Sequence, residues 1–200
     1  MTKVILINGP PRSGKDTVAN LMSDYWIRTA NDYTLHKYKF ADLLHLFWQE
    51  IFYAFRTDKD TDRYVDGDLK STMHEDIGVS YRNGMIALSE DFVKPMLGKN
   101  FFGRLTANKI LRDAEESHYP LVAVISDSGF VEEAISIVET FGAENVLLVH
   151  LFRDKCNFTG DSRSYINLDA FGVQTIEIEN QSFKQLEVDT IKALEDFVAK

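Results

Sequence analysis

A glycine-rich segment near the amino end, Gly9-Pro10-Pro11-Arg12-Ser13-Gly14-Lys15, constrains the fold more than any other feature. An apolar run at residues 4–7 precedes it and is typical of a parallel strand buried on both faces. A helical pattern follows it from Thr17. A strand, a Gly-x-x-x-x-Gly-Lys turn and a helix form an anion site, because backbone N–H groups and the positive helix end point at the phosphates. Lys15 can reach the terminal phosphates, so the segment predicts a nucleoside triphosphate site.

Seven residues are the candidate nucleotide-binding set: Gly9, Arg12, Ser13, Gly14, Lys15, Asp16 and Thr17. Asp16 stands where this type of loop usually has a Ser or Thr whose hydroxyl binds Mg²⁺. A carboxylate is also a hard oxygen ligand, so Asp16 can bind the ion directly or through water. Thr17 either donates a hydroxyl to a phosphate or only begins the helix.

The whole chain favours a small substrate over a nucleic acid. It has 200 residues, of which 44% are apolar, and we expect one domain over residues 1–200 with an excursion or lid. A net charge of -9 repels nucleic acid, so a small phosphorylated substrate is the simpler expectation. Cys156 is the single cysteine, which fits a reducing compartment. The first apolar run is too short for a signal peptide and no later run could span a bilayer, so we expect a soluble, cytoplasmic protein.

Strand and helix patterns alternate along the first half of the chain. Residues 35–40 are predicted as a strand, and Ala41 begins a helix with an aromatic stripe. Members of that stripe recur at helical spacing, which favours core over a platform for bases: Leu44, Phe47, Trp48, Ile51, Phe52 and Phe55. Residues 56–79 form a charged segment, which we predict to be solvated and mobile. Its Asp58, Asp60 and Asp62 do not make a calcium loop, because Arg63 and Leu69 stand where Gly and Glu are needed.

The second half of the chain continues the alternation. Two helices are predicted between residues 80 and 117, broken near Gly98, and residues 121–125 are the clearest buried strand. The remaining elements are a helix with its inner face at Val131, Ala134, Ile135 and Val138, strands at 145–151 and 174–178, and a closing helix at 183–198. This order predicts an α/β fold, a parallel sheet with helices on both faces. Ligands of such sheets bind at the carboxyl ends of the strands.

Charged residues follow two of these strands. Asp127 ends a hydrophobic strand, where loop enzymes of this kind place an acid for the water shell of Mg²⁺, although it could also cap the next helix. Arg153, Lys155 and Arg163 lie in a polar stretch at residues 153–172, which we predict to be a lid. Positive groups that close over a transferring phosphate speed its transfer. The candidate catalytic residues are therefore Lys15, Arg153 and Arg163, together with the acid Asp127. Alternatively, these bases balance nearby acids at the surface, and we assign Lys155 that role.

Several segments together resemble the bacteriophage deoxynucleoside monophosphate kinases. They are Asn8 to Ala19 (NGPPRSGKDTVA), Lys39-Phe40-Ala41-Asp42, the stretch of residues 80–102 with Tyr81-Arg82 and Leu97-Gly98-Lys99-Asn100-Phe101-Phe102, and Val124 to Ala134 (VISDSGFVEEA). They occur in order over roughly the first three quarters of the chain. The resemblance implies a P-loop kinase-like parallel sheet, ATP with Mg²⁺ as donor and a deoxynucleotide phosphate as acceptor.

The resemblance also implies site residues. Lys15 and Asp16 belong to the donor site, Asp42 and Arg82 to the acceptor side, and Asp127 is the acid at the strand end. A guanidinium at Arg82 can grip an acceptor phosphate with two hydrogen bonds. Asp16 and Asp127 are then the candidate metal ligands. The sequence departs from the family at Gly129, where an arginine is expected.

Three functions remain open at this level. The first is an ATP-dependent kinase that acts on a deoxynucleoside monophosphate, in the host cytoplasm if the chain is phage-encoded. The second is a kinase for hydroxymethylated pyrimidine bases within DNA, which needs a local basic groove to offset the acidic balance. The third is a nucleotide-binding switch without catalysis. We expect no membrane partner, and a homodimer stays among the possible oligomeric states.

Overall fold

The chain divides into two compact units. The computed structural model describes residues 1–29, 32–54, 61–65 and 67–199. Unit 1 comprises Met1–Phe40 and Phe102–Lys200, and unit 2 comprises Ala41–Phe101. Of the two segments predicted to move, residues 56–79 belong to unit 2 and residues 153–172 to unit 1. The single kinase domain over residues 1–200 stays a prediction.

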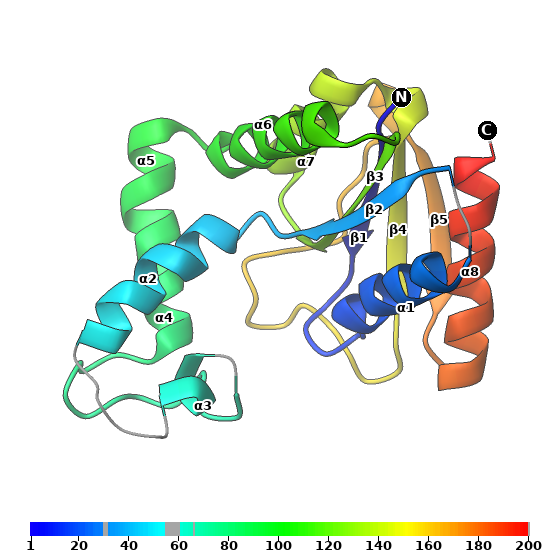
Figure 1. Ribbon diagram of the computed structural model, residues 1–200. Helices are drawn as coiled ribbons and strands as arrows, with labels where there is room; N and C mark the ends of the chain where they lie inside the picture. Colours follow the sequence, from blue (N-terminus) through cyan, green and yellow to red (C-terminus); the bar gives the residue numbers. More distant parts are fainter. Residues whose placement is uncertain (30–31, 55–60, 66, 200) are drawn as a thin grey trace. The chain divides into compact units, whose positions relative to one another are not determined.

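Unit 1 is built on a five-stranded parallel sheet (Figure 1). Its strands are β1 (Lys3–Asn8), β2 (Thr34–Tyr38), β3 (Leu121–Ser128), β4 (Val146–Phe152) and β5 (Gln174–Glu179). They lie in the order β2-β3-β1-β4-β5, and each neighbouring pair is parallel. The α/β fold predicted from the alternating pattern is therefore confirmed. Because all five strands run the same way, their carboxyl ends meet at one edge of the sheet.

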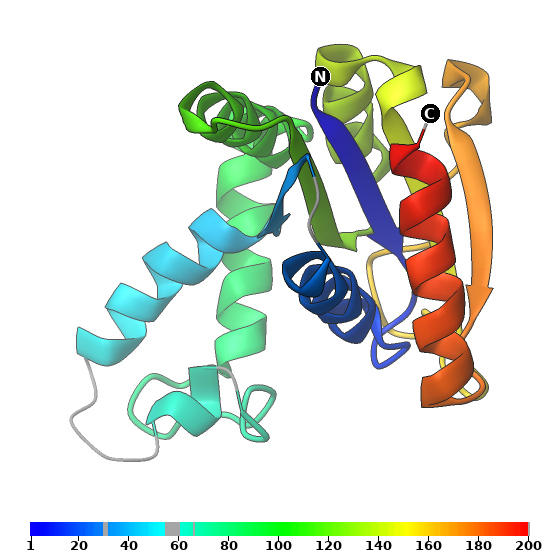
Figure 2. The ribbon, with the colours of Figure 1, turned by 45° about the vertical axis from the view of Figure 1, so that its right-hand side comes forward.

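Helices cover both faces of this sheet. They are α1 (Lys15–Arg28), α6 (Phe101–Glu116), α7 (Val131–Phe141) and α8 (Phe183–Val198), with short 3₁₀ turns η2 (Ala143–Asn145) and η3 (Asp169–Phe171). Helices α1 and α8 pack beside each other on one face, and α7 lies against β1 and β4 on the opposite face (Figures 1 and 2). The apolar runs of β1 and β3 are thus covered on both sides, as a central parallel strand requires.

The main core lies between the sheet and the α1–α8 pair. Ile5 and Ile7 of β1 belong to this core, together with Val122 and Val124 of β3. Val4 and Leu6 are also fully buried, and by strand alternation they point to the face that α7 covers. On that side, a Cβ on Gly103 of α6 would lie 2.3 Å from the carbonyl oxygen of Glu133 in α7. Helix α6 therefore approaches the α7 backbone as closely as a glycine allows.

Unit 2 is a small helical body with its own core. Its helices are α2 (Asp42–Ala54), α3 (Thr61–Val65), α4 (Tyr81–Ala87) and α5 (Lys94–Leu97), and a π-helical segment η1 (Leu88–Val93) joins the last two. The Ser80 side chain caps α4 by accepting a hydrogen bond from the Asn83 amide. The core consists of Phe52, Val65 and Tyr81, with partly buried aromatic neighbours.

Two sequence-based interpretations of this unit need correction. Leu44 and Phe52 of the aromatic stripe are buried, but Phe47 is 55% exposed, so the stripe is only partly core. Within unit 2, α2 packs against α4, and one neighbouring helix buries a narrower face than the stripe covers. The charged segment is not wholly solvated either, since it forms α3 and buries Val65 and His74. Its residues 56–60 and 66, like Phe55 of the stripe, lie outside the described residues.

Candidate phosphate site

The glycine-rich segment forms the loop between β1 and α1, as the sequence predicts. We call residues 9–15 the candidate phosphate loop. Gly14 precedes α1 with a φ of 107°, which a glycine adopts without strain. A Cβ on Gly9 would lie 2.7 Å from the Leu151 carbonyl oxygen, and one on Gly14 would lie 2.7 Å from Nδ2 of Asn180. Both glycines are therefore needed for the loop to lie against the strand ends.

The Lys15 side chain folds back across this loop. Its Nζ donates hydrogen bonds to the carbonyl oxygens of Gly9 at 2.7 Å and Pro10 at 2.8 Å. Burial, reinforced by the positive charge of Arg163, lowers the pKa of Lys15 to about 8. Nearby acids, Asp16 first among them, favour the charged ammonium without outweighing burial, and a phosphate group would add to their effect. The position of Lys15 thus fits the role of a phosphate ligand.

Residues from the ends of β4 and β5 hold the loop in place. The Asn180 side chain donates to the carbonyl oxygen of Ser13 at 2.8 Å, and Arg153 Nη1 donates to that of Arg12 at 3.1 Å. Arg153 was selected from the sequence, but Asn180 was missed. Its only signal was its place two residues after a predicted strand, at the edge where ligands bind.

Asp16 lies in the first turn of α1 and is held by one partner from β3 and one from the chain just beyond β2. Its Oδ1 accepts a hydrogen bond from Ser126 Oγ at 2.8 Å and lies 3.1 Å from Lys39 Nζ. Partial desolvation raises the pKa of Asp16, but the Ser126 hydrogen bond and the Lys39 charge outweigh it, so the pKa lies below its usual value. Asp16 is therefore a carboxylate at neutral pH, as an Mg²⁺ ligand must be.

Asp127 lies near the carboxyl end of β3 and ties it to the chain beyond β2. Its Oδ1 accepts a hydrogen bond from the Phe40 amide at 2.8 Å. The negative charges of Asp16 and Asp127 both act on Lys15 and favour its charged form. Among the described residues, no group of three or more His, Cys, Asp or Glu side chains could hold a metal. Two carboxylates nevertheless suit Mg²⁺, which binds through one or two protein carboxylates together with substrate phosphates and water.

Arg163 also reaches this site, from the segment between β4 and β5. Its Nε and Nη2 donate to the two carboxylate oxygens of Asp161 at 2.8 Å and 2.7 Å. The hydrogen bond with Asp161 is the main cause that raises the pKa of Arg163, and the charges of Asp127 and Glu133 add to it. The structure thus brings Arg163 within electrostatic range of Lys15 and Asp127, which are distant from it in sequence.

The middle of the predicted lid is anchored to the sheet in this structure. Asn8 Nδ2 donates to the carbonyl oxygens of Ser128 at 2.8 Å and Ser164 at 3.0 Å, and Asn8 Oδ1 accepts from the Ile166 amide at 3.0 Å. Ile166 and Leu168 are buried. A segment that closes over a ligand would therefore move on either side of this anchor, and closure itself stays a prediction.

The two residues expected on the acceptor side, Asp42 and Arg82, both belong to unit 2. Asp42 is the first residue of α2. Arg82 lies in the first turn of α4, is exposed, and donates from Nε to Ser71 Oγ at 3.2 Å. Their assignment to an acceptor stays a prediction.

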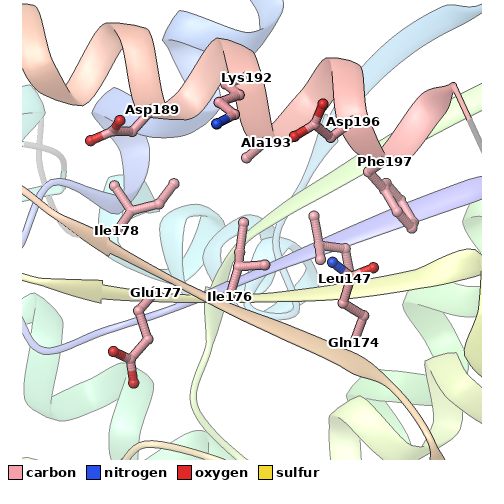
Figure 3. Close-up of a pocket in the computed structure, with 10 residues that line it drawn as sticks. All are labelled: Leu147, Gln174, Ile176, Glu177, Ile178, Asp189, Lys192, Ala193, Asp196 and Phe197. Atoms are coloured by element: carbon pink, nitrogen blue, oxygen red, sulfur yellow. The ribbon is translucent and has the colours of Figure 1, made fainter.

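Two hollows lie in unit 1. One of about 550 Å³ adjoins the candidate phosphate loop and is lined by Phe152, Arg153, Asp154, Glu179, Asn180 and Gln181. The other, of about 290 Å³, lies between β5 and α8 (Figure 3). There Ile176 and Ile178 face α8, Lys192 stands between Asp189 and Asp196, and Glu177 points to the other side of the strand (Figure 3). Arg153 and Asn180, which line the first hollow, donate hydrogen bonds to carbonyl oxygens of the loop, so the first hollow is the one joined to the site.

Comparison with known proteins shows the fold. No protein-family model matches the chain, and no curated protein sequence does. The chain is similar to the solved structure of an unliganded sugar kinase from Janibacter sp. HTCC2649, with 12% identity, a TM-score of 0.50, and coverage of 100% of this chain and 95% of that one. A thymidylate kinase from Candida albicans has 13% identity and a TM-score of 0.43, with coverage of 98% and 92%. The chain therefore has an α/β fold of the kind found in that sugar kinase. Among the described residues, no helix is long and apolar enough to cross a membrane.

Proposed function

We propose that this protein is an ATP-dependent phosphotransferase that phosphorylates a deoxynucleoside monophosphate. The observation that carries the proposal is the candidate phosphate loop at the carboxyl edge of the sheet, with Lys15 folded into it. Asp127, Arg153 and Arg163 lie around the same edge. Phosphoryl transfer depends mainly on positioning and on charges that stabilise the transferring group.

The surroundings of the loop suggest how the donor is held. Its phosphates would lie against the backbone of residues 9–15 and against Lys15. Its nucleoside would occupy the hollow of about 550 Å³ beside the loop, between Arg153 and Asn180. Since both side chains also donate hydrogen bonds to loop carbonyls, donor binding would be coupled to the shape of the loop.

Asp16 and Asp127 are the residues that would hold Mg²⁺. Bound there, the ion would neutralise negative charge that develops during phosphoryl transfer. The ion pair between Asp16 and Lys39 has a clear role in this scheme, because a cation of the protein keeps the carboxylate compensated and oriented. Ser126 orients the same carboxylate from β3.

The nature of the acceptor rests on the resemblance to phage deoxynucleotide kinases and on the acidic balance of the chain. Arg82 would bind the acceptor phosphate, and Asp42 would contact the rest of the nucleotide. A net charge of -9 weighs against DNA as the acceptor.

One assay tests this proposal. The protein is incubated with γ-labelled ATP, Mg²⁺ and separate pools of deoxynucleoside monophosphates, ribonucleoside monophosphates and DNA that contains hydroxymethylated pyrimidines. Label should pass to a deoxynucleoside monophosphate. Lys15→Ala should lower that rate roughly 100- to 1000-fold, the effect of removing one charge placed for the transition state. Lys192→Ala, at an exposed lysine of α8, is the matched control and should retain the wild-type rate.

The other outcomes decide against the proposal in distinct ways. Transfer to DNA alone would establish the base-kinase alternative. Binding of ATP without transfer to any pool would establish a nucleotide-dependent switch. Normal transfer by Lys15→Ala would remove the candidate phosphate loop from the reaction.

A further inference from the structure

Gly129, between β3 and α7, has a backbone conformation that does not require a glycine. A φ between +20° and +160° occurs at six glycines of the described chain, and Gly129 is not one of them. An alanine could therefore adopt the same backbone at position 129 without strain. Some other feature of the structure must explain why a glycine stands at position 129.

The space beside Gly129 is filled by the stem of Arg163. A Cβ at position 129 would lie 2.5 Å from Cδ of Arg163, 2.6 Å from its Cγ and 2.9 Å from its Cβ. These atoms are the three nearest to that position, and all belong to one side chain. The stem of Arg163 therefore passes directly over the α-carbon of Gly129, along the line that a side chain would take.

Both ends of this contact are fixed by other interactions. The Arg163 head is held by two hydrogen bonds to Asp161. The backbones on either side are joined by Asn8, whose Nδ2 donates to the carbonyl oxygens of Ser128 and Ser164, next to Gly129 and Arg163. Because the two segments are clamped together, neither can retreat to make room for a larger residue at position 129.

We propose that Gly129 is a positioning residue that seats the Arg163 stem and thereby places its guanidinium at the candidate phosphate site. The inference rests on the proposed function and deepens it, since it gives Arg163 a defined course into the site. Asp127, two residues before Gly129, accepts a hydrogen bond from the Phe40 amide, just beyond β2. The same short stretch thus places an acid and a base at one edge of the sheet.

Charge supports this placement. The positive charge of Arg163 acts on Lys15, and the negative charge of Asp127 acts on both. Asp161 already pairs with Arg163, and a transferring phosphoryl group, which spreads negative charge over its oxygens, would add a second anion beside the two cations. A misplacement of about 1 Å at such a group can cost roughly 100-fold in rate.

Gly129→Ala tests the proposal. The added methyl group should displace the Arg163 stem and lower kcat about 100-fold, with the KM for ATP within about threefold of wild type, since an interaction specific to the transition state affects kcat. Ser162→Ala, at an exposed neighbour of Arg163, is the control and should keep the wild-type kcat. Arg163→Met keeps the stem but loses the charge, so it should match the kcat loss of Gly129→Ala.

A double-mutant cycle separates positioning from a structural role. In an Arg163→Gly background the stem is absent, so Gly129→Ala should change kcat less than about twofold because coupled residues are not additive. An equal loss of kcat with and without the Arg163 side chain would overturn the proposal, as would full kcat in Gly129→Ala or Arg163→Met.

Affinity for inorganic tripolyphosphate does not depend on turnover. It is measured by calorimetry on the four proteins of the cycle: wild type, Gly129→Ala, Arg163→Gly and the double variant. If the wild-type protein transfers no phosphate, the proposed function fails. The positioning role still stands if Gly129→Ala weakens tripolyphosphate binding only when Arg163 is present. Equal tripolyphosphate affinity in wild type and Gly129→Ala would refute it.

Discussion

Asn8 is a single side chain that joins three separate parts of unit 1, so its removal should be costly. It is fully buried at the end of β1. Its amide makes three hydrogen bonds, to the carbonyl oxygens of Ser128 and Ser164 and from the Ile166 amide. Asn8→Ala deletes all three and leaves their backbone partners without them. The Ile166 amide is then a buried donor, since that residue is only 4% exposed.

The expected loss follows from these contacts. Each hydrogen bond contributes about 0.5–1.5 kcal/mol net, so the free energy of unfolding should fall by about 1.5–4.5 kcal/mol. For a chain of this size, a change of 1 kcal/mol shifts Tm by roughly 2–4 °C, which gives a decrease of about 3–18 °C. Hydrogen exchange at the Ile166 amide should accelerate as the segment around it opens.

Urea unfolding and calorimetry measure the first effect, and exchange followed by NMR measures the second. Asn108→Ala, on the exposed side of α6, is the matched control and should change stability by less than about 0.5 kcal/mol. If Asn8→Ala were as stable as this control, with unchanged exchange at Ile166, the argument that Asn8 anchors the 164–166 segment would be wrong.

Two further predictions concern packing and charge. Gly103→Ala should lower the free energy of unfolding by about 1–3 kcal/mol, because the new methyl group meets the Glu133 backbone. An increase in the free energy of unfolding of about 1 kcal/mol, the intrinsic advantage of Ala over Gly in a helix, would contradict the close approach of α6 and α7. The rate of Lys15 acylation, followed by mass spectrometry, should reach half its maximum near pH 8 rather than near 10.5, and tripolyphosphate should raise that midpoint. Because the folded state depresses the pKa of Lys15, the titration of this residue should make the protein more stable as pH rises from 8 to 10.5. An acylation midpoint above pH 10 would refute the burial of the Lys15 ammonium.

The sequence alone was sufficient to predict those parts of the structure that depend on residues adjacent in the chain. The apolar runs that became β1 and β3 are buried on both faces, and such runs are visible locally. The turn from β1 through Gly14 into α1 was predictable because a strand, a positive-φ glycine and a helix are consecutive in the chain. Lys15 and Asp16 were selected for the same reason, since their positions depend on that turn alone.

Hydrophobic periodicity predicted burial less well where burial depended on contacts with other elements of the fold. Phe47 of α2 has the periodicity of a core residue, yet it is exposed, because periodicity shows that a face is apolar and not how much of it a neighbour covers. Likewise, the charged stretch around α3 buries Val65 among the aromatic rings of unit 2. The mostly charged composition of this stretch gave no sign that Val65 would be buried.

The tertiary structure decided which distant residues share the candidate site. Asn8 and Ile166 are 158 positions apart, and Asp16 and Ser126 are 110 apart, but strand order brings each pair together. Nothing in a local pattern encodes the order β2-β3-β1-β4-β5, which follows from how the helices pack on both faces. The seat of Arg163 over Gly129 has the same origin: in sequence Gly129 is one small residue after a strand, and only the folded chain shows which side chain uses the space it leaves.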